Sequence, residues 1–315
     1  MSKIAFIFPG QGAQYVGMGK DFYDAYEEAR EVYRKAKEAT GLDIEALCFT
    51  ENDKLNITEY TQIAMLTTEV ALLKVLESKG VHADVCAGLS LGEYGALAAA
   101  GVMELENLFQ LIRLRGIYMQ EAYPVGGAMT AVLGLDAGVI ESTLKGIDGI
   151  VSIANYNCPG QLVISGNVEA VKAACEKLKA RAATALQEAG AKRCIPLKVS
   201  GPFHSALLTD AGKKLGEALS KVEIHKPRIP YVCNVEAAYV TQEDSIKELL
   251  EKQVSHSVCW QQSVEKMIAD GTDTFIEIGP GKTLTGFMRK INKDVKVMNV
   301  DKLADMEKVL EELGC

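Results

Sequence analysis

Residues 88–92 form a Gly-Leu-Ser-Leu-Gly motif between a short apolar segment, residues 83–87, and a run of small residues at helical spacing, residues 91–100. A strand, a sharp turn and a helix in this order place the serine in a crowded turn, where only glycine-sized neighbours fit. The motif therefore predicts a nucleophile elbow at Ser90. The backbone N–H of Leu91 and the helix dipole would stabilise an oxyanion formed there. The same residues also allow a simpler Gly-Ser turn, in which Ser90 only caps the helix.

Charge and composition exclude several classes of partner. The chain has 315 residues and a net charge of −8, with lysine and arginine dispersed along it. This argues against nucleic acid or an anionic membrane as a partner, and no apolar run approaches the ~18 residues of a membrane span. The apolar run at residues 4–8 is too short for a secretory signal. The eight cysteines form no C-x-x-C pair, so we expect reduced thiols in a cytoplasmic protein.

The order of the expected elements indicates an α/β fold, either one large domain or a large domain that carries a smaller one. At the amino-terminal end we expect two strands and four helices, at residues 4–8 and 83–87 and at residues 25–38, 61–78, 91–100 and 105–122. Towards the carboxyl end we expect strands at residues 231–234 and 274–278, and helices at residues 244–253, after Gly279-Pro280-Gly281, and at residues 303–313.

A different order of elements begins at a glycine-rich joint, residues 126–127. We expect strands and helices in the order β-α-β-β-α-β, at residues 129–133, 137–144, 150–155, 161–165, 168–182 and 192–199. This order is typical of a ferredoxin-like module. The prediction is an α/β-hydrolase-like large domain with a parallel sheet, residues 1–125 and 198–315, and an inserted ferredoxin-like small domain, residues 126–197. The alternative is that these elements extend the main sheet.

A nucleophilic serine needs a base, and the chain has only four histidines. His82 is expected at the far end of the strand that leads to the motif, and His225 lies in a polar stretch before a proline. His204 follows the strand expected at residues 192–199, in a Gly-Pro loop of the kind where α/β folds place functional side chains. We therefore predict His204 as the base, with His256 as the second candidate.

Several sequence blocks occur in a fixed order along nearly the whole chain: residues 8–14 (FPGQGAQ), 88–94 (GLSLGEY), 113–116 (RLRG), 155–161 (NYNCPGQ), 201–205 (GPFHS) and 277–286 (EIGPGKTLTG). In these blocks the chain resembles the malonyl-CoA:acyl-carrier-protein transacylases of fatty-acid synthesis, which are related to the acyltransferase domains of polyketide synthases. The resemblance implies malonyl-CoA as substrate, acyl carrier protein as partner, and no metal or bound cofactor.

The resemblance also assigns roles to residues. Ser90 matches the nucleophile and His204 the general base, while the backbone N–H groups of Gln11 and Leu91 match the oxyanion hole. Arg115 matches the residue that binds the free carboxylate of the substrate. A guanidinium group forms two parallel charge-assisted hydrogen bonds with a carboxylate, which favours malonyl over acetyl groups.

The group that orients the histidine has more than one candidate. Asp210 and Glu277 are possible from the sequence, but the family uses a main-chain carbonyl on the loop where Gln253 lies, and we assign the orienting role to Gln253. Asn155 and Asn157 match a loop near the acyl pocket, although asparagine in a turn is equally well explained by local hydrogen bonds.

The chain departs from the family pattern at two places. Leu89 stands where most relatives have a histidine, and His256-Ser257 stands where relatives often have Asn-Pro. Phe203 resembles the malonyl-selective members, since a bulky ring leaves little room for an α-methyl branch.

The function expected from these features is malonyl transfer through a malonyl-serine intermediate, supplying fatty-acid synthesis. The alternatives are a malonyl acyltransferase of a polyketide pathway, an α/β-hydrolase thioesterase that uses water as acceptor, and an inactive scaffold that docks a carrier. Because carrier proteins are acidic, docking would need a local basic patch. Arg289, Lys290 and Lys293 are candidates for it, or else form a solvated helix end.

Overall fold

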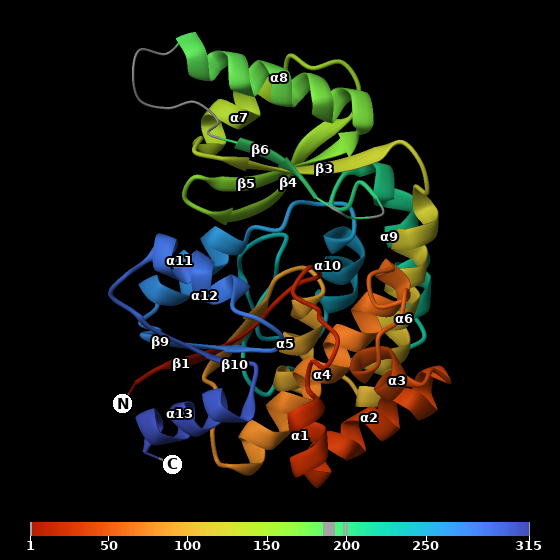
Figure 1. Ribbon diagram of the computed structural model, residues 1–315, viewed down its shortest axis with the longest axis vertical. Helices are drawn as coiled ribbons and strands as arrows, with labels where there is room; N and C mark the ends of the chain where they lie inside the picture. The colour runs from red at the N-terminus through yellow and green to blue at the C-terminus, as the bar shows by residue number, and fades with distance from the viewer. Residues whose placement is uncertain (1, 185–192, 198, 200, 315) are drawn as a thin grey trace.

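The computed structural model describes residues 2–184, 193–197, 199 and 201–314. It contains a six-stranded sheet with the strand order β10-β9-β1-β2-β7-β8 and a four-stranded sheet with the order β4-β5-β3-β6. In Figure 1 the four-stranded sheet and its two helices lie above the larger sheet and the helices around it.

The six-stranded sheet is parallel except at one edge, where β7 and β8 pair antiparallel. Its strands are β1 (Ile4–Phe8), β2 (Val85–Gly88), β7 (Tyr231–Val232), β8 (Tyr239–Val240), β9 (Thr274–Ile278) and β10 (Lys296–Val300). Phe8 pairs with Gly88 at the carboxyl ends of the two central strands. The loop after β1 and the motif at residues 88–92 after β2 therefore leave the sheet side by side.

Helices cover both faces of this sheet, because its strands alternate apolar side chains between two hydrophobic clusters. Phe6 and Phe8 face the larger cluster, whereas Ala5 and Ile7 face the smaller one. The helices on the larger cluster are α1 (Lys20–Ala25), α2 (Glu27–Thr40), α3 (Ile44–Phe49), α4 (Thr58–Ser78), α5 (Gly92–Ala100), α6 (Leu105–Ala122), α9 (Thr209–Leu219), α10 (Ile246–Gln253) and α13 (Leu303–Leu313). The smaller cluster is covered by α11 (Trp260–Ala269) and α12 (Thr283–Ile291).

The second sheet is antiparallel and separate from the first. Its elements follow in the order β3 (Gly127–Leu133), α7 (Ala137–Leu144), β4 (Val151–Cys158), β5 (Gln161–Asn167), α8 (Val168–Thr184) and β6 (Arg193–Pro196). This is the element order expected from the sequence, and the alternative that these elements extend the main sheet is wrong. Of the strand expected at residues 192–199, residues 192 and 198 lie outside the described residues.

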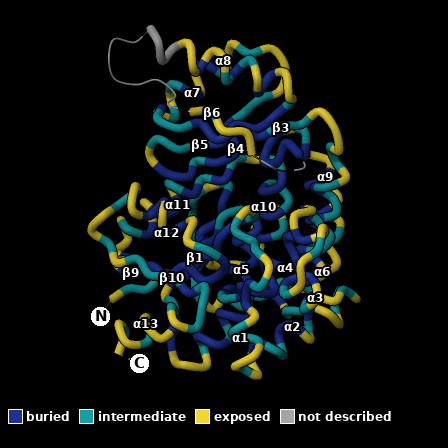
Figure 2. The backbone as a smooth tube through the Cα atoms, in the orientation of Figure 1, coloured by how far each residue is buried: buried dark blue, intermediate teal, exposed yellow. Residues whose placement is uncertain are grey.

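The two faces of the small sheet pack against different hydrophobic clusters. Val132, Ile153 and Ile164 point to α7 and α8, whereas Met129 and Val163 point away from these helices and join the larger cluster. Figure 2 shows buried backbone running from this sheet into the strands and helices below it, with the exposed residues on the outside. Within the described ranges, no helix combines the length and the apolar character that a bilayer crossing requires.

Candidate active site

Ser90 lies on a sharp turn between β2 and α5 and has a φ angle of +57°, a conformation that costs a non-glycine residue about 1–2 kcal/mol. A Cβ atom on Gly88 would lie 1.9 Å from the carbonyl oxygen of Gly92, and a Cβ atom on Gly92 would lie 2.2 Å from that of Phe8. Glycine is therefore required on both sides of the serine. The elbow expected from the sequence is confirmed. The simple cap is wrong, because the α5 N-cap residue is Leu91 and it has no side-chain cap.

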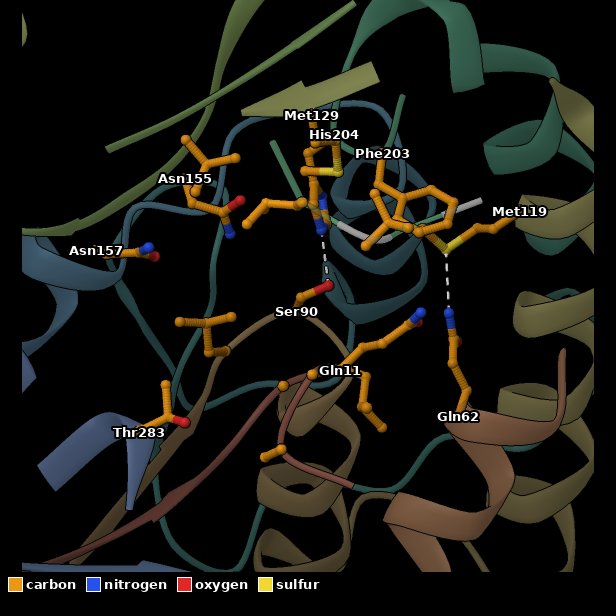
Figure 3. Close-up of a pocket in the computed structure, with 18 of the residues that line it drawn as sticks. Gln11, Gln62, Ser90, Met119, Met129, Asn155, Asn157, Phe203, His204 and Thr283 are labelled. Carbon is orange, nitrogen blue, oxygen red and sulfur yellow. Dashed lines mark hydrogen bonds between the residues drawn. The ribbon is translucent and has the colours of Figure 1, made fainter. Parts of the chain in front are cut away.

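The hydroxyl group of Ser90 contacts the imidazole ring of His204. Oγ lies 2.7 Å from Nε2, and Nδ1 of the same ring lies 2.8 Å from the backbone carbonyl oxygen of Gln253. Because a carbonyl can only accept, Nδ1 carries the proton and Nε2 accepts from the serine. Burial lowers the pKa of His204 to about 4, and the positive charge of Arg115 acts in the same direction. The ring is therefore a neutral base at physiological pH. Figure 3 shows this contact.

Arg115 on α6 is buried beside the serine. Its Nη2 donates to Oγ of Ser90 over 3.1 Å and to Oε1 of Gln253 over 2.9 Å, and Nη1 donates to Oε1 of Gln62 over 2.7 Å. Its partners are thus a hydroxyl and two amide oxygens, and within the described part of the chain no carboxylate forms a salt bridge with it. Burial lowers the pKa of Arg115, because it removes water from the charged guanidinium group. A carboxylate on a ligand would supply the missing counter-charge.

The residues expected to form the oxyanion hole follow the two central strands. Gln11 comes after β1 and Leu91 after β2, and both line the cleft that contains Ser90. Among the described residues, neither backbone N–H group has a hydrogen-bond acceptor. The side chain of Gln11 is held by Thr58, to whose Oγ1 it donates over 3.1 Å. Two backbone donors without an acceptor in the described residues therefore come from residues that line the cleft beside Ser90.

The cleft has a volume of about 220 Å³ and lies between the loops of the large sheet and the inner face of the small one. Phe203 and Leu89 form part of its apolar wall, and Asn155 and Asn157 line it from β4 (Figure 3). The expectation that these two asparagines lie in a loop is wrong, since both are in a strand. Oδ1 of Asn157 is buried without a partner in the described chain, so it is available to a ligand.

The structure decides among the candidates for orienting the histidine. Asp210 is exposed and pairs with Lys213 at 3.3 Å. Glu277 is buried, and its carboxylate accepts the backbone N–H groups of residues 284 and 285 over 2.9 and 2.7 Å, at the start of α12. The carbonyl of Gln253 contacts His204, and Gln253 is the last residue of α10 rather than part of a loop.

The second candidate for the base, His256, makes its contact elsewhere. His256 is exposed and contacts the carbonyl of Lys252 through Nδ1 over 2.8 Å. Its neighbour Ser257 donates to the carbonyl of Ile153 on β4 over 2.6 Å. This segment, where relatives often have Asn-Pro, is therefore tied to the small sheet by a serine side chain.

The sequence assigned no role to three buried residues of the site, Gln62, Glu93 and Asn234, although Glu93 lies in the block at residues 88–94. Oε2 of Glu93 accepts from Nε2 of Gln253 over 2.7 Å and from the backbone N–H of Asn234 over 3.2 Å. Burial raises the pKa of Glu93 to about 7, against the opposing effects of Gln253, Asn234 and Arg115. No local pattern could identify these residues, because their partners lie 53 to 160 residues away.

The comparisons with known proteins agree with this geometry. The acyl transferase domain family matches residues 5–309. A curated malonyl CoA-acyl carrier protein transacylase from Bacillus subtilis is 42% identical over 318 residues, which cover 99% of this chain and 98% of the relative. The chain belongs to the malonyl CoA-acyl carrier protein transacylase family.

This acyl transferase is also similar to solved structures. The malonyl CoA-acyl carrier protein transacylase of Clostridium perfringens has a TM-score of 0.94 and 45% identity, covering 99% of this chain and 98% of the other. A malonyl-transacylase solved in complex with a type II polyketide synthase acyl-carrier protein has a TM-score of 0.93 and 37% identity, covering 99% and 100%. In the described part of the acyl transferase, no three histidine, cysteine or acidic side chains gather as a metal site would require.

Proposed function

We propose that this protein transfers the malonyl group of malonyl-CoA to the phosphopantetheine thiol of acyl carrier protein, through a malonyl ester on Ser90. One observation carries the proposal: Oγ of Ser90 lies 2.7 Å from Nε2 of His204 and 3.1 Å from the guanidinium group of Arg115. A nucleophile beside its base suits acyl transfer in general. A buried cation beside the nucleophile selects an acyl group that carries its own carboxylate. The named relatives support the same assignment.

In the first half-reaction, Nε2 of His204 accepts the Ser90 proton while Oγ bonds to the thioester carbonyl carbon. The carbonyl oxygen becomes an oxyanion and accepts hydrogen bonds from the N–H groups of Gln11 and Leu91. The C–S bond then breaks, the sulfur of coenzyme A takes the proton from His204, and the malonyl ester remains. We propose no metal and no redox cofactor, because every proton and electron pair stays within the chain and its substrate.

In the second half-reaction, the phosphopantetheine thiol gives its proton to His204 and its sulfur attacks the ester carbonyl. The Ser90 oxygen leaves with that proton. Arg115 binds the malonyl carboxylate throughout, and Gln253 orients both His204 and Arg115. Asn155, Asn157 and Phe203 shape the acyl pocket, where the ring of Phe203 narrows the space for an α-methyl branch. This division of roles follows from the contacts and from the resemblance together.

The proposal extends to the fold. We describe residues 1–125 and 198–315 as an α/β-hydrolase-like catalytic domain, because the nucleophile follows a central parallel strand and precedes a helix. We describe residues 126–197 as an inserted ferredoxin-like domain, because its antiparallel sheet has the element order β-α-β-β-α-β. We place the reaction in the cytoplasm, on the cysteine pattern of the sequence.

The group that accepts the acyl chain distinguishes this function from the alternative functions. A thioesterase would pass the acyl group to water, whereas the relative solved with an acyl-carrier protein supports a carrier thiol. That carrier belongs to a type II polyketide synthase, so polyketide synthesis remains the alternative pathway to fatty-acid synthesis. The intact contact between Ser90 and His204 argues against an inactive scaffold.

Intact-protein mass spectrometry after mixing with malonyl-CoA tests the proposal, with acetyl-CoA and Ser90→Ala as controls. We expect a malonyl adduct that requires Ser90, exceeds the acetyl adduct, and is lost to acyl carrier protein faster than to water. An adduct lost at one rate with or without the carrier would identify a hydrolase instead. No adduct with either thioester would identify a scaffold.

A further inference from the structure

The side chain of Asn234 brackets the nucleophile elbow. Its Oδ1 accepts the backbone N–H of Ser90 over 2.7 Å, and its Nδ2 donates to the carbonyl oxygen of Gly88 over 2.6 Å. Asn234 is 1% exposed. The two consecutive peptide groups that precede Ser90, one on each side of Leu89, are therefore joined through one side-chain amide in the protein interior.

Asn234 is itself held in place from two directions. Its backbone N–H donates to Oε2 of Glu93 over 3.2 Å, and its carbonyl accepts the N–H of Cys259 over 2.8 Å. Strand β7 pairs with β2 up to Val232, opposite Ala87. Beyond that pair the main chain of β7 turns away, and the Asn234 amide continues the contact with the chain that follows β2. The two side-chain hydrogen bonds of Asn234 thus take the place of the next main-chain hydrogen bonds between β2 and β7.

We infer that Asn234 is a positioning residue that holds Ser90 in its left-handed conformation and so directs Oγ at the base and the Leu91 N–H at the oxyanion. The inference rests on the proposed function, in which Ser90 is the nucleophile. One donor and one acceptor at fixed spacing are needed, because one elbow partner is a carbonyl and the other an N–H. Only an amide, or a protonated carboxyl group of the same shape, provides both.

The test measures the single-turnover rate of Ser90 malonylation in the full chain. Asn234→Ala removes both bonds, and we expect the rate to fall on the order of 10²-fold, as misplacement of a reacting group by about 1 Å does. Asn234→Asp discriminates more sharply. At pH 8 an ionised carboxylate could not donate to the carbonyl of Gly88, and it would add a second buried negative charge beside a residue whose backbone already contacts Glu93, so this variant should be slow. At pH 5 the protonated carboxyl group would restore donor and acceptor, and the rate relative to wild type should rise at least tenfold.

The rate ratio removes the effects of other titrating groups, since wild type and variant share them. The titratable residues around Asn234 are Glu93 on α5, which accepts its backbone N–H, Cys259 before α11, whose N–H donates to its carbonyl, and Tyr231, Cys233 and Glu236 on its own segment. Across the elbow, His204 and Arg115 contact Oγ of Ser90. Burial and the nearby Glu93 carboxylate both raise the pKa of an aspartate here above its ordinary value, because each disfavours a second buried negative charge, and we expect it to titrate between pH 5 and pH 8.

Asn52→Asp is the matched control. Its amide also bridges backbone groups, accepting from residues 54 and 55 and donating to the carbonyls of residues 47 and 50, in a turn away from the cleft. We expect its rate ratio to be the same at pH 5 and pH 8. A constant ratio for Asn234→Asp as well would overturn the inference, even if Asn234→Ala failed to fold. Absence of a malonyl adduct in wild type would instead overturn the proposed function.

Discussion

Nη2 of Arg115 donates to Oγ of Ser90 over 3.1 Å and, at the same time, to the side chain of Gln253 over 2.9 Å. The backbone carbonyl of Gln253 in turn accepts from Nδ1 of His204. One residue at the end of α10 therefore connects the cation that we propose binds the substrate carboxylate with the base that we propose activates the serine. A change at Gln253 should therefore alter both substrate choice and proton transfer.

Arg115→Gln should reduce selectivity for malonyl groups. We expect kcat/KM for malonyl-CoA to fall about 10²-fold or more, because hydrogen bonds to charged groups contribute about 1.5–3 kcal/mol each. The rate with acetyl-CoA should change much less, and steady-state kinetics with both thioesters measure the difference. Arg113→Gln is the control on the same helix, since Arg113 pairs with Glu59 at 2.7 Å instead. An equal loss with both thioesters would contradict the carboxylate-binding role.

The pH dependence of Ser90 acylation should follow His204. With a pKa of about 4 in the folded protein, the ring stays neutral down to that pH, and the rate should fall about tenfold per pH unit only below it. Arg115→Gln should move this fall to higher pH, because it removes a charge that lowers the pKa of His204. Single-turnover rates from pH 3.5 to 8 measure both curves, and superimposed curves would contradict the coupling.

The same pKa has a consequence for stability. The pKa of His204 lies below its ordinary value of 6.5. Its contribution to the free energy of unfolding is therefore complete above pH 6.5 and is lost as the pH falls towards 4.

Glu93 should have the opposite effect on stability. Burial raises the pKa of Glu93 from 4.5 to about 7, so its contribution is complete below pH 4.5 and is lost as the pH rises past 7, on the order of 3 kcal/mol. Glu93→Gln removes this dependence. We expect the free energy of unfolding of the variant, relative to wild type, to increase between pH 5.5 and 8.5. Urea denaturation measures it, and Glu307→Gln on the exposed face of α13 should give the same difference at both pH values.

Gly88→Ala should prevent the elbow from forming. The new Cβ would lie 1.9 Å from the carbonyl oxygen of Gly92, which is backbone and cannot move aside cheaply. We expect a loss of more than about 3 kcal/mol or no folded protein, measured by urea denaturation. Gly138→Ala is the control, since it lies in α7 with open space around it, and it should gain about 0.5–1 kcal/mol.

The basic end of α12 should contribute to carrier binding. The first part of this helix lines the cleft through Leu284 and Phe287. Arg289 and Lys290 in its last turn, and Lys293 just after the helix, are exposed. Their replacement by glutamate should raise KM for acyl carrier protein and leave malonylation by malonyl-CoA unchanged. Lys37→Glu is the control, because Lys37 lies on α2 and is not among the residues that line the cleft. Unchanged carrier kinetics in the triple variant would reject the patch.

Elements bounded by strong local signals were predictable. Strand β1 and helix α6 have the expected bounds, Ile4–Phe8 and Leu105–Ala122, because an apolar run stopped by Pro9-Gly10 and a helical period each require only neighbouring residues. Strand β10 was missed. Its sequence, Lys-Val-Met-Asn-Val, is a strand because it pairs with β9 at the sheet edge.

The sequence alone determined the elbow at Ser90, because glycines at positions 88 and 92 are a steric requirement of the turn itself. It also predicted His204 as the base from its place after an expected strand, and the resemblance assigned roles to Arg115 and Gln11. The tertiary structure decided which groups hold these residues. The contacts of Gln62, Glu93 and Asn234 depend on strands and helices that meet only when the sheets form, and hydrogen bonds across such distances leave no local pattern in the chain.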